Sequence, residues 1–301
     1  MELADVEALF LKVLSVVFPV VFVGGAGFLI ARLRIPFDVK VVNSIVSNLA
    51  MPSLVMSHLA AQHISFAQFS QMMLAALVGL CCFMGLGFIF LKVVGFPVRT
   101  YLNALTFANV GNVGLPIVYF AFGSTGLSYA LAFWVVVVLG LFTVGTWLPQ
   151  HSITFKRVLT APNIYGVIIG LTFMAMDWSF PAPLNSALTL LGGACIPLML
   201  LTLGFSIASL NYDMLITGAL IAVFHLVVAI FLASGLVQLF GFTGAAKGAF
   251  VLEMLMPSSV FAYLMAERYA PETSGHVASV VLFSTLFAML SLPVALAVLM
   301  R

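Results

Sequence analysis

The stretch ANVGNVGLPIVYFAFG, residues 108–123, places helix-breaking residues inside an otherwise apolar segment. Asn109, Gly111, Asn112, Gly114 and Pro116 all fall between flanks that are typical of a membrane-spanning helix. Non-helical backbone at membrane depth is tolerated only where it is buried in protein or lines a water-filled cavity. These residues therefore predict an unwound segment between two half-helices.

The composition indicates an integral membrane protein built from helices. Of 301 residues, 63% are hydrophobic and 7% are charged, whereas soluble domains carry about a quarter charged residues. The apolar runs reach the roughly 20 residues that a helix needs to cross a bilayer. A net charge of +2 with no basic run argues against a nucleic-acid partner.

Cutting the chain at its polar breaks predicts ten spans, five on each side of the polar stretch QHSITFKRVLT, residues 150–160. The halves are residues 1–150 and 151–301. Most of the loop lysines and arginines fall on one side, which by the positive-inside rule makes that side cytoplasmic and puts both termini outside the cytoplasmic membrane. The expected spans are 8–31, 39–60, 68–92, 100–122, 126–148, 160–177, 184–208, 212–240, 243–266 and 275–299.

An odd number of spans in each half has a geometric consequence, because the second half must then enter the membrane from the opposite side. Proline positions indicate that the halves are related as an inverted repeat. Pro197 follows Pro52, and Pro257 follows Pro116, by nearly the same number of residues. Such prolines break helical hydrogen bonding, although a simple kink in each helix is the alternative for Pro52 and Pro197.

The two interrupted spans, four and nine, predict a binding site for an anion. A half-helix begins with free N–H groups and a positive dipole end, and secondary transporters place such interruptions in corresponding positions of their two repeats. The partner of the first break is LEMLMPSSV, residues 252–260. The candidate substrate-binding residues are Asn109, Gly111, Asn112, Gly114, Pro116, Pro257, Ser258 and Ser259.

Glu253 is the only acidic residue well inside a predicted span, and we expect it to couple transport to Na⁺ or H⁺. Pairing with Lys247 on the same helix is the alternative, although a separation of six residues is poor geometry for it. Asn109 and Asn112 have an alternative role as hydrogen-bonding contacts between helices. His225 lies in span eight without a second ligand at metal spacing, so no metal site and no other cofactor is expected.

Three stretches resemble bacterial members of the auxin efflux carrier family, whose relatives include plant auxin exporters and bacterial permeases for malate. They are the break at residues 109–116, GGACIPLMLLTLGFSIASL at 192–210, and MPSSVFAYLMAERYAPETSGHVASVVLFSTLFAMLSLP at 256–293. The resemblance implies an all-α transmembrane fold of two inverted five-helix repeats with crossing broken helices four and nine, as in bile-acid sodium symporters and sodium–proton antiporters. It further implies a scaffold of spans 1, 2, 6 and 7 that forms a homodimer, and a moving transport unit of spans 3–5 and 8–10.

The expected function is secondary transport of a small organic anion, a carboxylate of auxin or dicarboxylate type, by alternating access. A cation–proton antiporter of related fold is the first alternative, but it would be expected to carry a pair of intramembrane acids. A non-transporting membrane sensor is the second, and it would need a soluble part to pass on its signal. No nucleophile and base arrangement suggests an enzyme.

Overall fold

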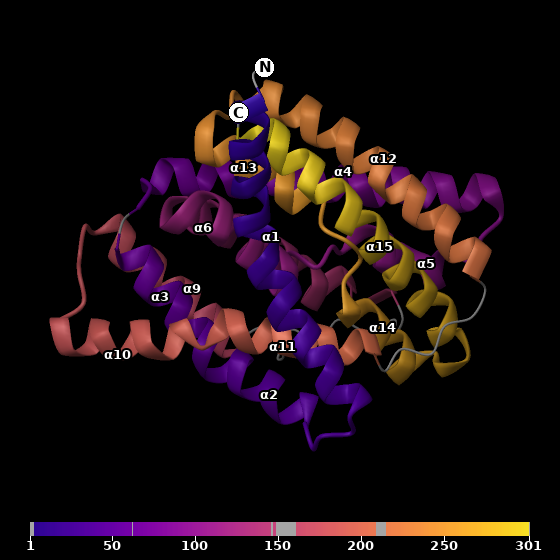
Figure 1. Ribbon diagram of the computed structural model, residues 1–301, viewed down its shortest axis with the longest axis horizontal. Helices are drawn as coiled ribbons and strands as arrows, with labels where there is room; N and C mark the ends of the chain where they lie inside the picture. The colour runs from indigo at the N-terminus through magenta and orange to yellow at the C-terminus, as the bar shows by residue number, and fades with distance from the viewer. Residues whose placement is uncertain (1–2, 62, 146, 149–160, 209–214, 301) are drawn as a thin grey trace.

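The computed structural model describes residues 3–61, 63–145, 147–148, 161–208 and 215–300, which form helices joined by short connections (Figure 1). Among these described residues, seven helical stretches are long and apolar enough to cross a membrane. The protein is therefore a multi-pass membrane protein whose described part is helical, as the composition predicts. The helices are α1 Leu3–Arg32, α2 Val39–Ile45, η1 Val46–Ala50, α3 Met51–Ala60, α4 Phe66–Val94, α5 Val98–Thr106, η2 Val110–Gly114, α6 Leu115–Gly140, η3 Leu141–Gly145, α9 Pro162–Ala175, α10 Ala182–Gly193, α11 Cys195–Ala208, α12 Leu215–Phe240, α13 Gly244–Met254, α14 Val260–Tyr269, η4 Pro271–Thr273 and α15 Ser274–Leu299.

The helices pack in two groups. In the first, α1 runs along α11, and α3 packs against α9 and α10. In the second, α12 packs on α15, α13 packs on α6, and α4 contacts both α5 and α6. In Figure 1, α9, α10 and α11 lie along the lower part of the view, away from α4 and α12.

The contact between α1 and α11 depends on glycines that bring the two backbones together. A Cβ added at Gly27 would lie 2.1 Å from the carbonyl oxygen of Leu201, and one added at Gly204 would lie 1.8 Å from that of Gly24. Small residues allow this close approach between membrane helices, whose association depends on packing.

A single methyl group at this contact should therefore destabilise the protein. Gly27→Ala forces the two backbones apart, and overpacking of this kind costs about 1–3 kcal/mol. Gly25→Ala is the matched control, because a Cβ at Gly25 meets nothing within 4 Å and alanine favours a helix over glycine by about 1 kcal/mol. Thermal unfolding in detergent should show a lower Tm for Gly27→Ala and an equal or higher Tm for Gly25→Ala. Equal losses in both variants would show that the close approach does not stabilise the fold.

The helix labelled α6 contains a reversal of the chain at Gly123, where φ is 62° and ψ is −155°. A Cβ at Gly126 would lie 3.2 Å from the carbonyl oxygen of Val118, whereas residues eight apart in a continuous helix are about 12 Å apart along its axis. The Asn103 side chain in α5 also donates to the carbonyl of Gly145 at 2.7 Å. Residues 124–145 therefore run back beside residues 98–122, which agrees with the separate spans four and five predicted from the sequence.

The first and last helices meet at their terminal ends. The ammonium group of Lys12 in α1 donates to the carbonyl of Met300, just after α15, at 3.3 Å. Figure 1 shows the two ends of the chain close together at the top of the view.

Candidate substrate and coupling site

Span four is broken, but not at the position that its glycines and proline predicted. Helix α5 ends at Thr106, and the chain is non-helical from Phe107 to Asn109. It then resumes as the π-helix η2, which continues into α6. Of the five residues predicted to be unwound, Asn109 alone lies in the break. The prediction is wrong for Gly111, Asn112, Gly114 and Pro116, which belong to the second half-helix.

The wider turn of η2 explains why Pro116 does not interrupt the helix. In a regular α-helix the proline ring would clash with the carbonyl four residues earlier, which here belongs to Asn112. A π-turn over Val110–Gly114 enlarges the helix just before Pro116, the second residue of α6. Pro52 is accommodated in the same way, as the second residue of α3 after the π-helix η1.

Span nine is broken where the sequence predicted. Helix α13 ends at Met254, residues 255–259 are not helical, and α14 begins at Val260. Pro257 lies inside this break, and Glu253 lies in the last turn of α13. The hydroxyl of Ser259 accepts a hydrogen bond from the N–H of Phe261 at 3.1 Å and so caps α14.

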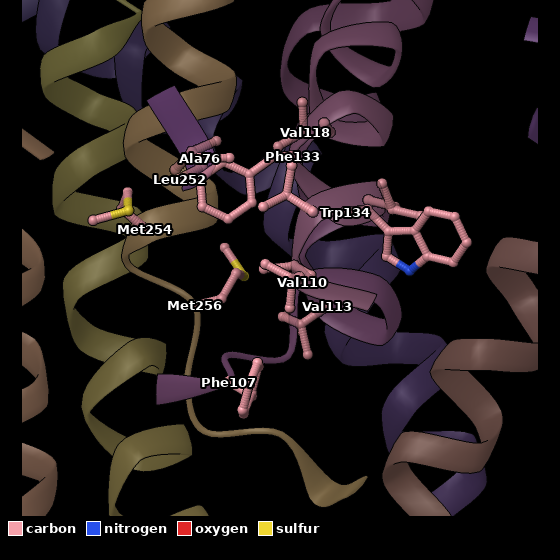
Figure 2. Close-up of a cluster of buried hydrophobic side chains, with 14 of the residues drawn as sticks. Ala76, Phe107, Val110, Val113, Val118, Phe133, Trp134, Leu252, Met254 and Met256 are labelled. Atoms are coloured by element: carbon pink, nitrogen blue, oxygen red, sulfur yellow. The ribbon is translucent and has the colours of Figure 1, made fainter. Parts of the chain in front are cut away.

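The two unwound segments pair with each other. Ala108 and Ser258 form an antiparallel β-bridge, in which the N–H of Asn109 donates to the carbonyl of Pro257 at 2.7 Å and the N–H of Ser259 donates to the carbonyl of Phe107 at 3.0 Å. Backbone groups without water must find partners inside the protein, and the crossing supplies them. Figure 2 shows Phe107 and Met256, from the two breaks, near Val110 and within a cluster of buried apolar side chains.

His225 in α12 connects the two breaks and was missed as a site residue in the sequence. Its Nδ1 lies 3.1 Å from the carbonyl oxygen of Leu105, and its Nε2 lies 3.0 Å from that of Met256. The Leu105 carbonyl loses its regular helical partner because the N–H of Asn109 donates to Pro257. The clue in the sequence is that interrupted helices leave such carbonyls without donors, which a lone histidine in a neighbouring span can supply.

Ser258 completes the crossing with both of its polar groups. Its hydroxyl donates to the carbonyl of Ala104, and its N–H donates to the hydroxyl of Ser284 in α15 at 3.0 Å. The residue is fully buried. The hydroxyls of Ser258 and Ser259, predicted as ligands, are thus both engaged with backbone groups.

Glu253 is completely buried, and neither carboxylate oxygen has a hydrogen-bond partner in the described part of the chain. The alternative pairing with Lys247 is therefore not formed. A Cβ added at Gly114 would lie 2.1 Å from Oε2 of Glu253, so the carboxylate packs directly against the backbone of the second half-helix. A glycine is needed at position 114 because any side chain would displace this carboxylate.

A small cavity of about 20 Å³ lies beside Glu253. Thr106, at the end of α5, and His225 also line it, and the Thr106 hydroxyl is buried without a hydrogen-bond partner among the described residues. The remaining walls are formed by Leu80, Phe83, Ala108, Phe133, Val137 and Met254. The volume suffices for one water molecule.

Both second half-helices begin at the crossing, where η2 starts at Val110 and α14 at Val260. The first N–H groups of a helix have no partner within the helix, and its dipole favours an anion there. Asn109 occupies the N-cap position of η2 but makes no side-chain capping hydrogen bond. Its amide, on a side chain that is 5% exposed, is thus available to a ligand. Asn112 is half-buried in η2.

A larger cleft of about 360 Å³ adjoins the crossing at Val113 and Pro257. Its other walls come from α1, α6, α11 and α15, so it lies at the boundary between the two groups of helices. Among the described residues that line it, Thr285 supplies the one polar side chain. The cleft suits an apolar molecule with few polar groups.

Comparison of the sequence with known proteins relates the chain to membrane transporters. The family of membrane transport proteins matches residues 149–296. An uncharacterized transporter of Methanothermobacter thermautotrophicus is 27% identical over 200 residues, which cover 63% of this chain and 64% of that protein, just under two thirds of its length. An uncharacterized transporter of Methanocaldococcus jannaschii is 25% identical over 269 residues, which cover 83% of this chain and 86% of that protein.

These matches relate the chain to membrane transporters. They also confirm the resemblance to the auxin efflux carrier family that was seen in the sequence. Within the described residues, no group of three or more His, Cys, Asp or Glu side chains comes together to hold a metal ion.

Proposed function

We propose that this protein is a secondary transporter that carries a small organic anion across the cytoplasmic membrane, with its substrate site at the crossing of the two broken helices. The observation that supports this most is the convergence of two half-helix N-termini at one place beside the cleft at Pro257. Helix N-termini suit a carboxylate. The apolar cleft suits the rest of the molecule.

The cleft favours a monocarboxylate with an apolar body over a dicarboxylate. A second carboxylate would need its own donors or a cation, and Thr285 is the one polar side chain that the described residues contribute to the cleft lining. Burying a charge without partners is costly. The substrate is therefore closer to the auxin type than to the malate type of acid.

Alternating access would follow from movement of one group of helices against the other. The cleft lies between α1 and α11 of the first group and α6 and α15 of the second. We propose that α1–α3 and α9–α11 form the scaffold, through which two copies associate, and that the second group carries the crossing across the membrane. Ten passes in two inverted repeats, with both termini outside, complete the proposal.

A cation–proton antiporter is the second candidate, and it is less well supported. Such a mechanism is expected to use a pair of buried acids. Among the acidic residues whose side chains the structure describes, only Glu253 is buried.

Uptake into proteoliposomes tests the proposed function. Labelled monocarboxylates with apolar bodies, such as indole-3-acetate, phenylacetate and benzoate, would be compared with malate and succinate, under sodium and proton gradients imposed separately. We expect uptake of at least one monocarboxylate above protein-free liposomes and less uptake of the dicarboxylates. Cation exchange without uptake of any acid would instead support the antiporter.

The inverted repeat predicts that two equivalent loops face opposite sides of the membrane. Thr125 follows the reversal at Gly123, and Glu272 lies between α14 and α15; both side chains are exposed. In a variant without the native cysteines, Thr125→Cys should react with an impermeant maleimide added outside intact cells. Glu272→Cys should react only after the membrane is permeabilised. Labelling of both from the same side would contradict the inverted arrangement.

A further inference from the structure

The cavity beside Glu253 collects polar groups that hydrogen bonding within the described residues leaves unsatisfied. Both carboxylate oxygens of Glu253 and the hydroxyl of Thr106 are buried without partners, and the same cavity is lined by the ring of His225. Buried polar side-chain atoms are nearly always hydrogen-bonded. Three unsatisfied oxygens around one space of about 20 Å³ therefore point to a small bound species.

The combined charge of Glu253 and His225 limits what the bound species can be. An ionised Glu253 beside a neutral His225 would leave a net negative charge out of contact with water, and an unpaired buried charge costs several kcal/mol. The charge is balanced by a proton on the carboxyl, by a proton on the imidazole, or by a bound metal cation.

The backbone of the crossing argues against a metal cation. Ion sites at interrupted membrane helices use the carbonyls that the interruption frees. Here Leu105 and Met256 face His225, Ala104 accepts from Ser258, and Phe107 and Pro257 accept from the opposite break. These five carbonyls lie within hydrogen-bonding distance of other groups, and the oxygens that line the cavity without a partner are the carboxylate oxygens of Glu253 and the hydroxyl of Thr106.

The position of His225 favours a proton instead. Both ring nitrogens lie within hydrogen-bonding distance of carbonyl oxygens, and a carbonyl can only accept. Hydrogen bonding to both requires an N–H on each nitrogen, which is the imidazolium form. Leu105 lies in the last turn of α5, and Met256 follows the C-terminal end of α13 by two residues; helix dipoles favour a positive charge at such ends.

We propose that Thr106, His225 and Glu253 form a binding site for a single proton, which resides on Glu253 or on His225 and makes the site electrically neutral. The Thr106 hydroxyl, directly or through one water molecule, accepts from the protonated group or donates to the ionised one. The proton comes from solvent when the site is open to it.

This site would couple proton and substrate movement, a consequence that rests on the proposed function. Glu253 packs against Gly114 in the half-helix whose N-terminus would receive the substrate anion. Like charges repel strongly at low dielectric constant. An anion should therefore bind more readily when the site holds its proton, so that proton and anion cross in the same direction.

Among the described residues that line the cavity, His225 and Glu253 are the two that can gain or lose a proton near neutral pH. The others come from α4, α5, α6, α13 and the break after α5, and they are Leu80, Phe83, Thr106, Ala108, Phe133, Val137 and Met254. Lys247, on the same helix as Glu253, lines a different groove, with α12 and α15.

The proton can be observed without any substrate. In lipid nanodiscs at pH 7 with choline as the only added cation, infrared spectroscopy reports whether Glu253 is protonated, as a carboxyl band lost in Glu253→Gln. Nitrogen NMR of labelled histidine reports whether one or both nitrogens of His225 carry hydrogen, with the signal assigned by its loss in His225→Gln. We expect one of two results: a protonated Glu253 with a neutral His225, or an ionised Glu253 with a doubly protonated His225.

Three outcomes would overturn the proposal: an ionised Glu253 beside a neutral His225, protonation of both groups at once, or a change in either signal when sodium replaces choline at constant pH. Glu267→Gln is the control, because this acid is exposed on α14 and its loss should leave the Glu253 band in place. The NMR measurement uses the unaltered chain, so it remains informative if Glu253→Gln fails to fold. A protein that holds the proton but transports no acid would refute the proposed function and retain the proton site.

Discussion

Proteoliposomes that contain the Glu253→Gln variant should exchange the transported acid across the bilayer but fail to accumulate it under a proton gradient. Glutamine keeps the size of glutamate and can hydrogen-bond to Thr106, yet it cannot bind and release a proton. Exchange requires only that the substrate-loaded protein moves back and forth across the membrane. Accumulation also requires the protein to bind a proton on one side and release it on the other in each cycle. The measurement is the ratio of internal to external labelled acid at steady state, which should exceed one in the parent and equal one in the variant.

Glu267→Gln provides the matched control, because it removes an exposed carboxylate from α14 and should accumulate the acid like the parent. A sodium gradient should drive accumulation in neither protein if the proton is the coupling ion. Accumulation by Glu253→Gln at the parental level under every imposed gradient would show that Glu253 has a structural role only.

Asn109→Ala should weaken substrate binding and transport by roughly ten- to a hundredfold while leaving the protein folded. The amide of Asn109 makes no capping hydrogen bond and lies at the start of the second half-helix. A hydrogen bond to a charged group contributes about 1.5–3 kcal/mol, and each 1.4 kcal/mol corresponds to about a tenfold change in affinity. The backbone N–H of Asn109, which donates to Pro257, is retained in alanine, so the crossing itself is preserved.

Initial uptake rates over a range of substrate concentrations measure this effect, and size-exclusion profiles in detergent check folding. Asn185→Ala is the control, since Asn185 is exposed on α10 and far in sequence from either break. Unchanged transport by Asn109→Ala would show that Asn109 does not bind the substrate and would favour the alternative, a contact between helices.

The sequence predicted the presence of both breaks more reliably than their positions. Pro257 marks its break correctly, because the chain is non-helical on both sides of it. Pro116 lies seven residues beyond the end of its break, which runs from Phe107 to Asn109, since the π-turn before it accommodates the ring. A proline requires that one hydrogen bond be absent, but surrounding packing decides whether the helix ends or widens.

The proposed proton site was only partly predictable from the sequence. An acid within an apolar span identifies Glu253 directly, because its burial is costly wherever it lies. Thr106 and His225 carry no such signal: a threonine at a helix end and a lone histidine are compatible with many environments. The histidine reaches Leu105, 120 residues earlier in the chain, and only the packing of α12 against α5 and α13 brings these groups together.

The position of the bound acid tests the central claim most directly. A density map from electron cryo-microscopy of the protein with the monocarboxylate that it transports would locate that acid. The account predicts density for the carboxylate at the first residues of η2, beside Asn109, with the apolar body extending past Pro257 into the cleft. Density confined to a different place, such as the groove of about 550 Å³ lined by Lys92 and Arg99, would contradict it.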